Sequence, residues 1–281
     1  MYERGKMKYA KINFQVFDYR QPLPEFSGSA LRGAFGYSLK RVVCINPSFT
    51  CRDCFAKDSC LYCSFYENTN NYHKYRFDIE LNQKEFDFGL FLFESACDKV
   101  PYALSAIHKM LSETGIGRDR KISKDFQIKI DGKIVYSGDS FSIPKEYVKI
   151  FKATDYNPNI TLKFITPFRT KKDNHLLKSN PPLELILSSI QNRANRLKDK
   201  KIERLNYTPI YETVESKVYF KELTRLSNRQ KTKMQIGGIM GEIKYKNLDK
   251  KSYELLKLGE IIGIGKQCVF GLGKIKVKGT E

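Results

Sequence analysis

The stretch that decides the fold is SYELLKLGEIIGIGKQCVFGLGKIKV, residues 252–277. We predict a short helix over residues 252–262 and a strand over residues 274–277. Between them lies a loop with four glycines, from Gly263 to Gly273. Glycine adopts backbone conformations that other residues avoid, so such a loop can turn a helix sharply into a strand.

The elements upstream of this stretch complete a recognisable order. We predict a strand at residues 160–167, then a helix at 181–197 that begins with two prolines. Two further strands, at 214–223 and 234–245, flank a basic connection. The second half of the chain therefore runs strand, helix, strand, strand, helix, strand, which is the split βαβ or ferredoxin-like arrangement.

The first half of the chain repeats this order. Its predicted elements are a strand at 8–17, a helix at 27–43, strands at 75–81 and 86–94, a helix at 101–112 and a strand at 126–130. A polar stretch containing proline, residues 138–158, marks the boundary between the halves. We therefore predict an α+β protein of two tandem ferredoxin-like domains, residues 1–150 and 151–281, with a cysteine-rich insertion at 44–66 in the first.

The composition favours a nucleic-acid partner. The chain of 281 residues has 50 Lys and Arg against 31 Asp and Glu, a formal net charge of +19. Such an excess attracts phosphate backbones, although a lysine-rich solvated surface is the alternative. No stretch has the length and apolarity of a membrane span or the pattern of a signal peptide. We therefore expect a cytoplasmic protein without a membrane partner.

The glycine loop is not a known nucleotide-binding motif. A P-loop requires Ser or Thr after its GK pair, whereas Gly273-Lys274 is followed by Ile275. The dinucleotide fingerprint fails because Cys268 stands where a glycine is required. Two interpretations stay open: the backbone N–H groups bind phosphate, or the loop is only a tight helix-to-strand connection.

Five of the seven cysteines are clustered between Cys44 and Cys63. The spacing Cys51-x2-Cys54-x5-Cys60-x2-Cys63 contains two CxxC pairs, which suit tetrahedral thiolate coordination of zinc. Clustering and the missing secretory signal favour a metal site over a disulfide framework. Disulfides, an iron–sulfur cluster or free thiols are the alternatives. A zinc ion here would be structural, because the insertion has little core of its own.

Several stretches together resemble a known protein family. They are SNRQKTKMQIGGIMGEIKY (227–245), LLKLGEIIGIGKQCVFGLGKIKV (255–277), ITPFRTK (165–171), FSGSALRGAFGYSLKR (26–41), CLYCSFYE (60–67) and PYALSAIHKMLSETGIGRDR (101–120). The chain resembles the CRISPR-associated repeat-processing endoribonucleases of the RAMP superfamily of RNA-binding proteins. The resemblance implies two tandem RAMP domains. It also implies binding of CRISPR repeat RNA and a single cut that releases guide RNAs.

The resemblance further implies a metal-independent reaction, in which a ribose 2′-OH attacks the adjacent phosphate and leaves a 2′,3′-cyclic phosphate. No cofactor is then needed for catalysis. Many family members carry a histidine in or soon after the first helix, but residues 27–63 contain none here. The catalytic candidates are therefore Tyr37, Lys40 and His175: a phenol and an ammonium on the first helix and a histidine after a basic run.

The candidate RNA-binding residues are cations and loop glycines. They are Arg32, Arg41, Arg118, Arg120, Arg225, Arg229, Lys231, Lys233, Gly263, Gly265, Lys266, Gly271, Gly273 and Lys274. The family's CxY pattern aligns with Cys60-Leu61-Tyr62, which implies a zinc quartet of Cys44, Cys51, Cys54 and Cys60, with Cys63 as the alternative ligand. The expected partners are CRISPR repeat RNA or mature guide RNA and other CRISPR-associated subunits. The alternative function is that of a non-catalytic RNA-binding subunit of an effector complex.

Overall fold

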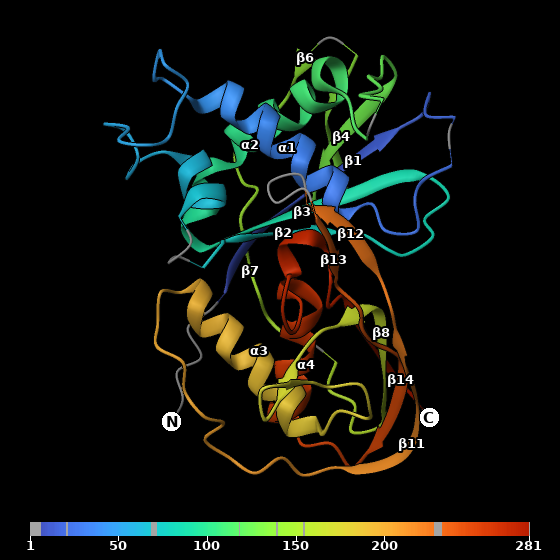
Figure 1. Ribbon diagram of the computed structural model, residues 1–281. Helices are drawn as coiled ribbons and strands as arrows, with labels where there is room; N and C mark the ends of the chain where they lie inside the picture. Colours follow the sequence, from blue (N-terminus) through green and yellow to red (C-terminus); the bar gives the residue numbers. More distant parts are fainter. Residues whose placement is uncertain are drawn as a thin grey trace. The chain divides into compact units, whose positions relative to one another are not determined.

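The computed structural model describes residues 7–20, 22–68, 72–117, 119–138, 140–153, 155–227 and 232–280. The chain forms two compact units (Figure 1). Unit 1 comprises Met1–Asp78 and Asn82–Ile150, and unit 2 comprises Ile79–Leu81 and Phe151–Glu281.

Unit 1 is an antiparallel sheet covered by two helices. Its main elements are β1 (Lys8–Val16), α1 (Gly28–Val43), β2 (Tyr75–Asp78), β3 (Phe86–Phe93), α2 (Val100–Lys109) and β4 (Phe126–Ile130). The strand order β2-β3-β1-β4, with β1 between its two antiparallel partners, is that of a ferredoxin-like domain. The strands β5 (Lys133–Ser137) and β6 (Ser140–Phe141) extend the sheet beyond β4, and β7 (Lys149–Ile150) pairs with β1.

Alternation in β1 and helical spacing in α1 build the core of unit 1. Ile12 and Phe14 point to the same face of the sheet because side chains alternate along a strand, and both are fully buried. Phe35 and Leu39 lie one turn apart on α1 and are also fully buried. Short irregular helices complete the unit: η1 (Cys63–Glu67), η2 (Glu94–Lys99) and η3 (Met110–Thr114).

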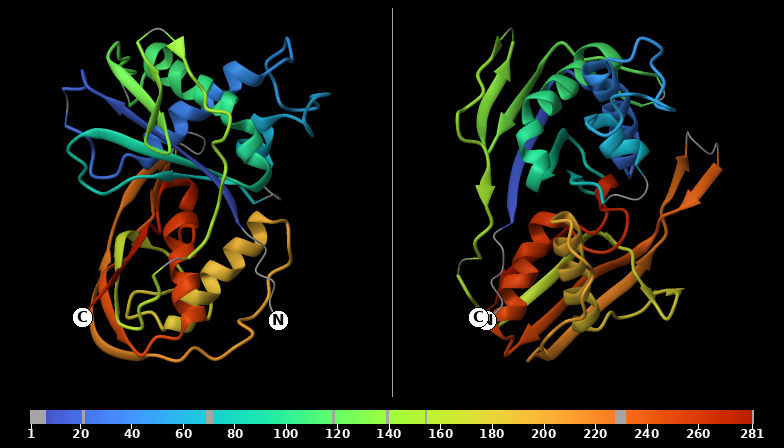
Figure 2. Two further views of the ribbon diagram at one scale, coloured as in Figure 1. Left: turned by 180° about the vertical axis from the view of Figure 1, so that it is seen from behind. Right: turned by 90° about the vertical axis from the view of Figure 1, so that its left-hand side faces the viewer.

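Unit 2 has the same topology. Its main elements are β8 (Ile160–Phe168), α3 (Leu183–Leu197), β11 (Glu212–Lys221), β14 (Gly238–Lys246), α4 (Lys250–Ile262) and β15 (Ile275–Gly279). The strand order β11-β14-β8-β15 corresponds element by element to that of unit 1. The helices α3 and α4 lie side by side (Figures 1 and 2). The α+β class with two tandem ferredoxin-like domains is thus confirmed.

One predicted strand is wrong in its extent. Residues 234–245 form two strands, β13 (Thr232–Gln235), which pairs with β12 (Thr224–Ser227), and β14. The break falls at Ile236 and Gly237. A Cβ on Gly237 would lie 2.5 Å from the Lys221 oxygen, and one on Gly238, the first residue of β14, would lie 2.6 Å from the Phe168 oxygen. The close backbone approach requires glycine, and the chain there leaves the main sheet to form a separate two-stranded hairpin. A smaller hairpin joins β9 (Lys171–Lys172) to β10 (His175–Leu176).

No described helix has the length and apolar character needed to cross a membrane.

Candidate functional site

The glycine loop is tied to its own unit by backbone hydrogen bonds. Ile264 N–H donates to the Gly273 oxygen at 2.9 Å, and Gly273 N–H donates to the Pro167 oxygen at 3.0 Å. Gly265 N–H donates to Ser189 Oγ at 2.7 Å. At Gly273, with φ of +71°, a Cβ would lie only 1.8 Å from the Ile264 oxygen. Position 273 therefore requires glycine for two reasons: its backbone is left-handed, and the Ile264 oxygen lies too close for a side chain.

The remaining glycines of the loop are engaged in the same way. Gly263 N–H donates to the Gly259 oxygen and closes α4, and Gly271 N–H donates to the Cys268 oxygen within the short turn η4 (Cys268–Phe270). All four glycine N–H groups thus have partners inside the protein. These hydrogen bonds favour the interpretation of a tight helix-to-strand connection, and binding of RNA by the loop glycines stays a prediction. The loop still presents one exposed cation, Lys266.

Lys274 is less exposed than Lys266 and forms an ion pair. Its Nζ lies 3.0 Å from Glu80 Oε1, and its side chain is 21% exposed. Glu80 belongs to the short segment Ile79–Leu81 that is part of unit 2.

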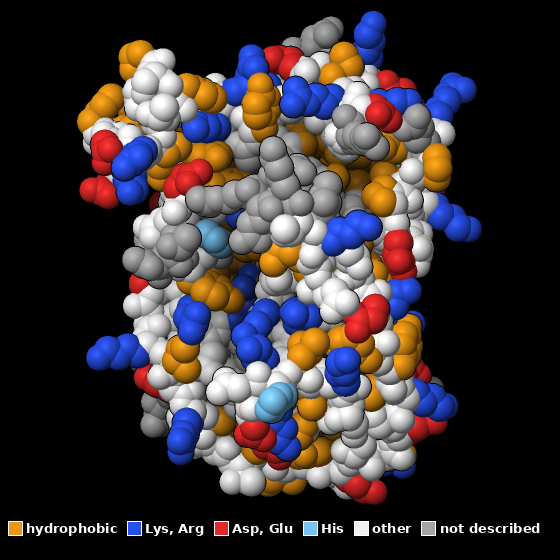
Figure 3. All heavy atoms as spheres, in the orientation of Figure 1, with side chains coloured by type: hydrophobic (Ala, Val, Ile, Leu, Met, Phe, Trp, Pro, Cys, Tyr) orange, Lys and Arg blue, Asp and Glu red, His pale blue; other side chains and the backbone are white. Residues whose placement is uncertain are grey.

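The basic hairpin of β12 and β13 contacts the glycine loop. The Arg225 guanidinium lies 4.4 Å from the centre of the Phe270 ring, and Arg225 Nη2 approaches Met234 Sδ at 3.2 Å. Lys233 on β13 is exposed. Arg229 and Lys231 lie outside the described residues. In unit 2, Lys and Arg side chains gather over the region of α3 and α4 on the face shown in Figure 3.

In unit 1, the structure brings Tyr37, Arg41 and Arg120 together. Arg41 Nη1 donates to the Tyr37 hydroxyl at 3.2 Å, because the two residues are one turn apart on α1. The guanidinium carbons of Arg41 and Arg120 lie 5.7 Å and 5.8 Å from the Tyr37 ring centre, within the range of cation–π attraction. The Tyr37 side chain is 45% exposed, so a ligand can reach its hydroxyl. Arg118 lies outside the described residues.

Lys40 and Arg32 do not join this cluster. Lys40 Nζ lies 4.9 Å from the centre of the Phe49 ring and 5.1 Å from that of Tyr62, on the side of the cysteine-rich insertion. Arg32 Nε donates to the Tyr75 hydroxyl at 2.9 Å, and its guanidinium lies 4.4 Å from the Tyr66 ring centre. Both cations are therefore held by aromatic neighbours.

Sequence analysis missed the role of Tyr66. Its hydroxyl donates to the Arg32 carbonyl oxygen at 2.7 Å, which ties η1 to α1. The signal was Gly36, since a Cβ there would lie 2.5 Å from Tyr66 Cε1. A glycine in the middle of a helix indicates that a neighbouring group approaches closely.

The three histidines have different surroundings. His175 on β10 in unit 2 is exposed. His108 packs against aromatic rings in unit 1, the nearest being Tyr136 at 4.7 Å between centroids, and burial lowers its pKa. His73 Nδ1 lies 3.3 Å from the Ser64 oxygen. Of these rings, that of His175 is the most accessible to a ligand.

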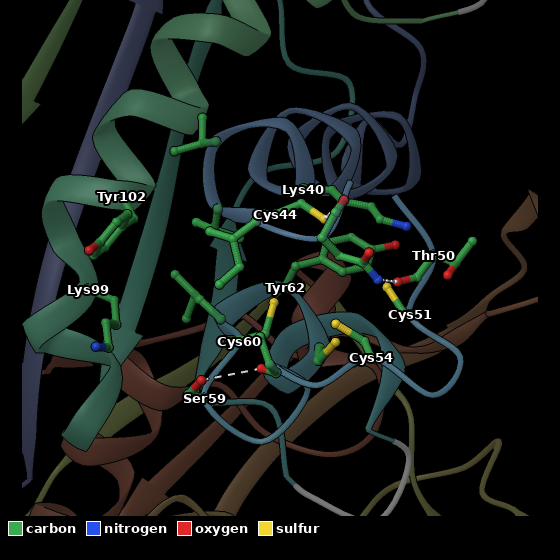
Figure 4. A pocket seen from close by; sticks show the side chains of 17 residues that line it. Lys40, Cys44, Thr50, Cys51, Cys54, Ser59, Cys60, Tyr62, Lys99 and Tyr102 are labelled. Carbon is green, nitrogen blue, oxygen red and sulfur yellow. Dashed lines mark hydrogen bonds between the residues drawn. The ribbon is translucent and has the colours of Figure 1, made fainter. Parts of the chain in front are cut away.

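A pocket in unit 1, with a cavity volume of about 260 Å³, is lined by all five clustered cysteines (Figure 4). The cysteines are free thiols. Burial raises the pKa of the Cys63 thiol to about 12, with further contributions from the neighbouring Cys60 and Cys51 thiols. Among the described residues, no three Cys, His, Asp or Glu side chains already have the arrangement of metal ligands.

Two family models match the chain. Residues 7–145 match AF_1859_N, an N-terminal domain, and residues 162–275 match the CRISPR-associated endoribonuclease Cas6. The second match runs from β8 to the start of β15 and includes both the basic hairpin and the glycine loop. Residues 162–275 thus form a Cas6-family domain. The family resemblance inferred from the sequence is thus confirmed.

Known structures and sequences are similar to this chain at low identity. A Cas6 product complex has a TM-score of 0.54 at 13% identity, covering 98% of this chain and 100% of that chain. Another Cas6 product complex has a TM-score of 0.52 at 14% identity, covering 96% and 99%. An uncharacterized protein of Archaeoglobus fulgidus is 23% identical, over 97% of this chain and 98% of its own length. The structural likenesses establish the fold, and the family match supports a role in CRISPR RNA processing or RNA binding.

Proposed function

We propose that this protein binds CRISPR repeat RNA and cleaves it by metal-independent attack of a ribose 2′-OH. The observation that carries the proposal is the cluster of Tyr37, Arg41 and Arg120, an exposed phenol beside two guanidinium groups. These groups are the kinds that such a cleavage requires at neutral pH without a histidine on α1.

The reaction joins the 2′-oxygen to phosphorus and breaks the bond from phosphorus to the 5′-oxygen. The products are a 2′,3′-cyclic phosphate and a 5′-hydroxyl, so one proton leaves the 2′-OH and one must reach the 5′-oxygen. Because Tyr37 accepts the Arg41 hydrogen bond on its oxygen, its own O–H is free to donate to the 5′-oxygen. Arg41 and Arg120 would stabilise the charge that accumulates on the phosphorane oxygens.

His175 stays the candidate for accepting the 2′-OH proton, because its side chain is exposed and an imidazole nitrogen can act as a general base. Lys40 is no longer among the proposed catalytic groups, because its ammonium lies over the Phe49 and Tyr62 rings.

RNA binding would also use the basic side chains of unit 2. Lys233 and Lys266 are exposed, and Arg225 is placed beside the glycine loop by its contact with Phe270. Such cations bind the phosphate backbone and make affinity strongly dependent on salt. Removing one phosphate contact, as in Lys266→Ala, should reduce the slope of log K against log salt by about 0.7 for a single strand.

The experiment is single-turnover cleavage of labelled repeat RNA in EDTA. We expect Tyr37→Phe to slow cleavage by about 10²- to 10⁴-fold with little change in RNA affinity, because the ring stays and the donor is lost. Tyr219→Phe is the matched control, because Tyr219 on β11 is also exposed, at 57%. This variant should cleave the RNA as fast as the wild type. Equal rates for Tyr37→Phe and wild type would remove Tyr37 from the mechanism.

A second candidate function is that of a non-cleaving RNA-binding subunit, associated with other CRISPR proteins. It is favoured by the lack of histidine in residues 27–63 and by the aromatic packing of His108. The cleavage experiment separates the two functions. If the protein binds repeat RNA tightly and the RNA stays intact, the result supports a non-cleaving RNA-binding subunit.

A further inference from the structure

The cysteine-rich insertion has a defined conformation without a hydrophobic core. None of residues 44–60 is buried, and the structure shows no helix or strand among them. Two of its large apolar side chains are mostly exposed, Ile45 at 68% and Phe55 at 77%. A chain segment that buries so little apolar surface cannot offset the conformational entropy lost on ordering, so another interaction must hold it.

The thiols of the insertion share one pocket. Cys51, Cys54, Cys60 and Cys63 all line this pocket. Figure 4 shows Cys51, Cys54 and Cys60 directing their sulfurs into the same space. Turns bring these cysteines together, since Lys57 N–H donates to the Cys54 oxygen at 3.1 Å and Cys60 N–H donates to the Lys57 oxygen at 3.4 Å. Cys63 follows as the first residue of η1.

We propose that Cys51, Cys54, Cys60 and Cys63 bind one Zn²⁺ ion as a structural tetrahedral site. Two CxxC pairs supply four thiolates, the ligand set that zinc prefers in structural sites. Binding converts four S–H groups into four Zn–S bonds and releases four protons to solvent. The thiols are not yet at ligand geometry, so the coreless segment from Cys51 to Cys60 must close around the ion as it binds.

The quartet inferred from the sequence, with Cys44 in place of Cys63, is the less favoured choice. The Cys44 thiol donates to the Asn46 oxygen at 3.8 Å, and Figure 4 shows it set apart from the other labelled sulfurs, on the α1 side. Four thiolates around Zn²⁺ carry a net charge of −2, and Lys40 and Lys99 line the same pocket. These ammonium groups would partly offset that charge.

The site would also support α1. Cys63 begins η1, whose Tyr66 hydroxyl is bonded to the Arg32 carbonyl on α1. Zinc binding by Cys63 would therefore fix the first residue of η1, and η1 in turn contacts α1, the helix that carries Tyr37. The proposal does not depend on RNA cleavage and can be tested on the full chain alone.

The first test is metal content of the full chain, purified under reducing conditions and without chelator. We expect one zinc per chain by elemental analysis, and Co²⁺ replacement should give the intense visible absorption of a tetrahedral thiolate site. Cys63→Ser should lose the zinc, whereas the matched control Cys44→Ser, from the same pocket, should keep it. Retention by Cys63→Ser with loss by Cys44→Ser would overturn the ligand assignment.

A second test needs no variant and so does not depend on whether Cys63→Ser folds. Lys57 is exposed within the proposed metal loop, and trypsin should cut after it at least about tenfold faster once zinc is removed from the wild type. Added Zn²⁺ should restore protection. Three outcomes would overturn the proposal: reduced protein that binds neither Zn²⁺ nor Co²⁺, iron with labile sulfide in the purified chain, or disulfides joining these cysteines.

Discussion

Substituting Gly273 by alanine tests the claim that the glycine loop is a packing device. A Cβ at this position would lie 1.8 Å from the Ile264 oxygen, far inside van der Waals contact. To relieve it, the two chain segments must separate. The hydrogen bond from Ile264 N–H to the Gly273 oxygen and that from Gly273 N–H to the Pro167 oxygen would then be lost or strained.

The magnitude follows from two contributions. The left-handed backbone at φ +71° costs alanine about 1–2 kcal/mol. Losing two buried hydrogen bonds adds about 1–3 kcal/mol for each group left without a partner. Gly132→Ala is the matched control, because Gly132 has φ +77° with nothing within 4 Å of a Cβ. Counting one group without a partner for each of the two bonds, we expect a loss of unfolding free energy of about 3–8 kcal/mol for Gly273→Ala and about 1–2 kcal/mol for Gly132→Ala.

The assay is urea unfolding followed by hydrogen exchange, which reports unfolding free energies for amides of each unit separately. Amides of α4 and β15 should lose protection in Gly273→Ala. Amides of β4 and β5 should lose less in Gly132→Ala. Equal losses in the two variants would refute the close-packing explanation and reopen the possibility that the loop is an adaptable phosphate cradle.

Two further outcomes are expected. Gly36→Ala should destabilise unit 1, because the added Cβ would meet the Tyr66 ring. Gly33→Ala on the same helix is the control: its Cβ meets nothing within 4 Å, so it should stabilise the unit by about 0.5–1 kcal/mol. Thermal unfolding compares the two variants, and equal changes in Tm would contradict the contact between Gly36 and Tyr66. At Asp249, partial burial raises the carboxyl pKa, but hydrogen bonds from Ser252 and neighbouring backbone groups outweigh this effect and hold the pKa below its usual value. Its stabilisation is therefore present at neutral pH and lost as the pH falls through the folded-state pKa. Asp249 is the N-cap of α4, so Asp249→Ala should lower the unfolding free energy by about 1 kcal/mol at pH 7 and by less in strong acid. Urea unfolding measures this loss at both pH values, and an equal loss at the two would contradict a role for the ionised carboxylate in capping.

The order of elements could be predicted because it depends on local patterns. Alternation in residues 8–17 and the two-proline start of α3 are properties of neighbouring residues, and each placed an element to within a few residues. The break at Gly237 could not be predicted in the same way. It depends on the Lys221 and Phe168 carbonyls, which approach it only in the folded unit.

The candidate site was predictable in type but not in arrangement. Helical spacing places Tyr37 beside Arg41, and the structure adds Arg120 from the loop after η3. Lys40 is three residues from Tyr37, and only the folded insertion, with Phe49 and Tyr62, shows that its ammonium lies elsewhere. The glycine loop pattern was compatible with both phosphate binding and tight packing, and the partners of its N–H groups inside the protein favour tight packing.

The most direct test of the proposed function uses two repeat RNAs in EDTA. The first is all ribose and locates the cut. The second carries a single 2′-deoxy nucleotide immediately 5′ of that position. We predict that the first is cut once, leaving a 2′,3′-cyclic phosphate, and that the second binds equally well but stays intact. Cleavage of the deoxy substrate, or binding without cleavage of either RNA, would contradict catalysis by 2′-OH attack.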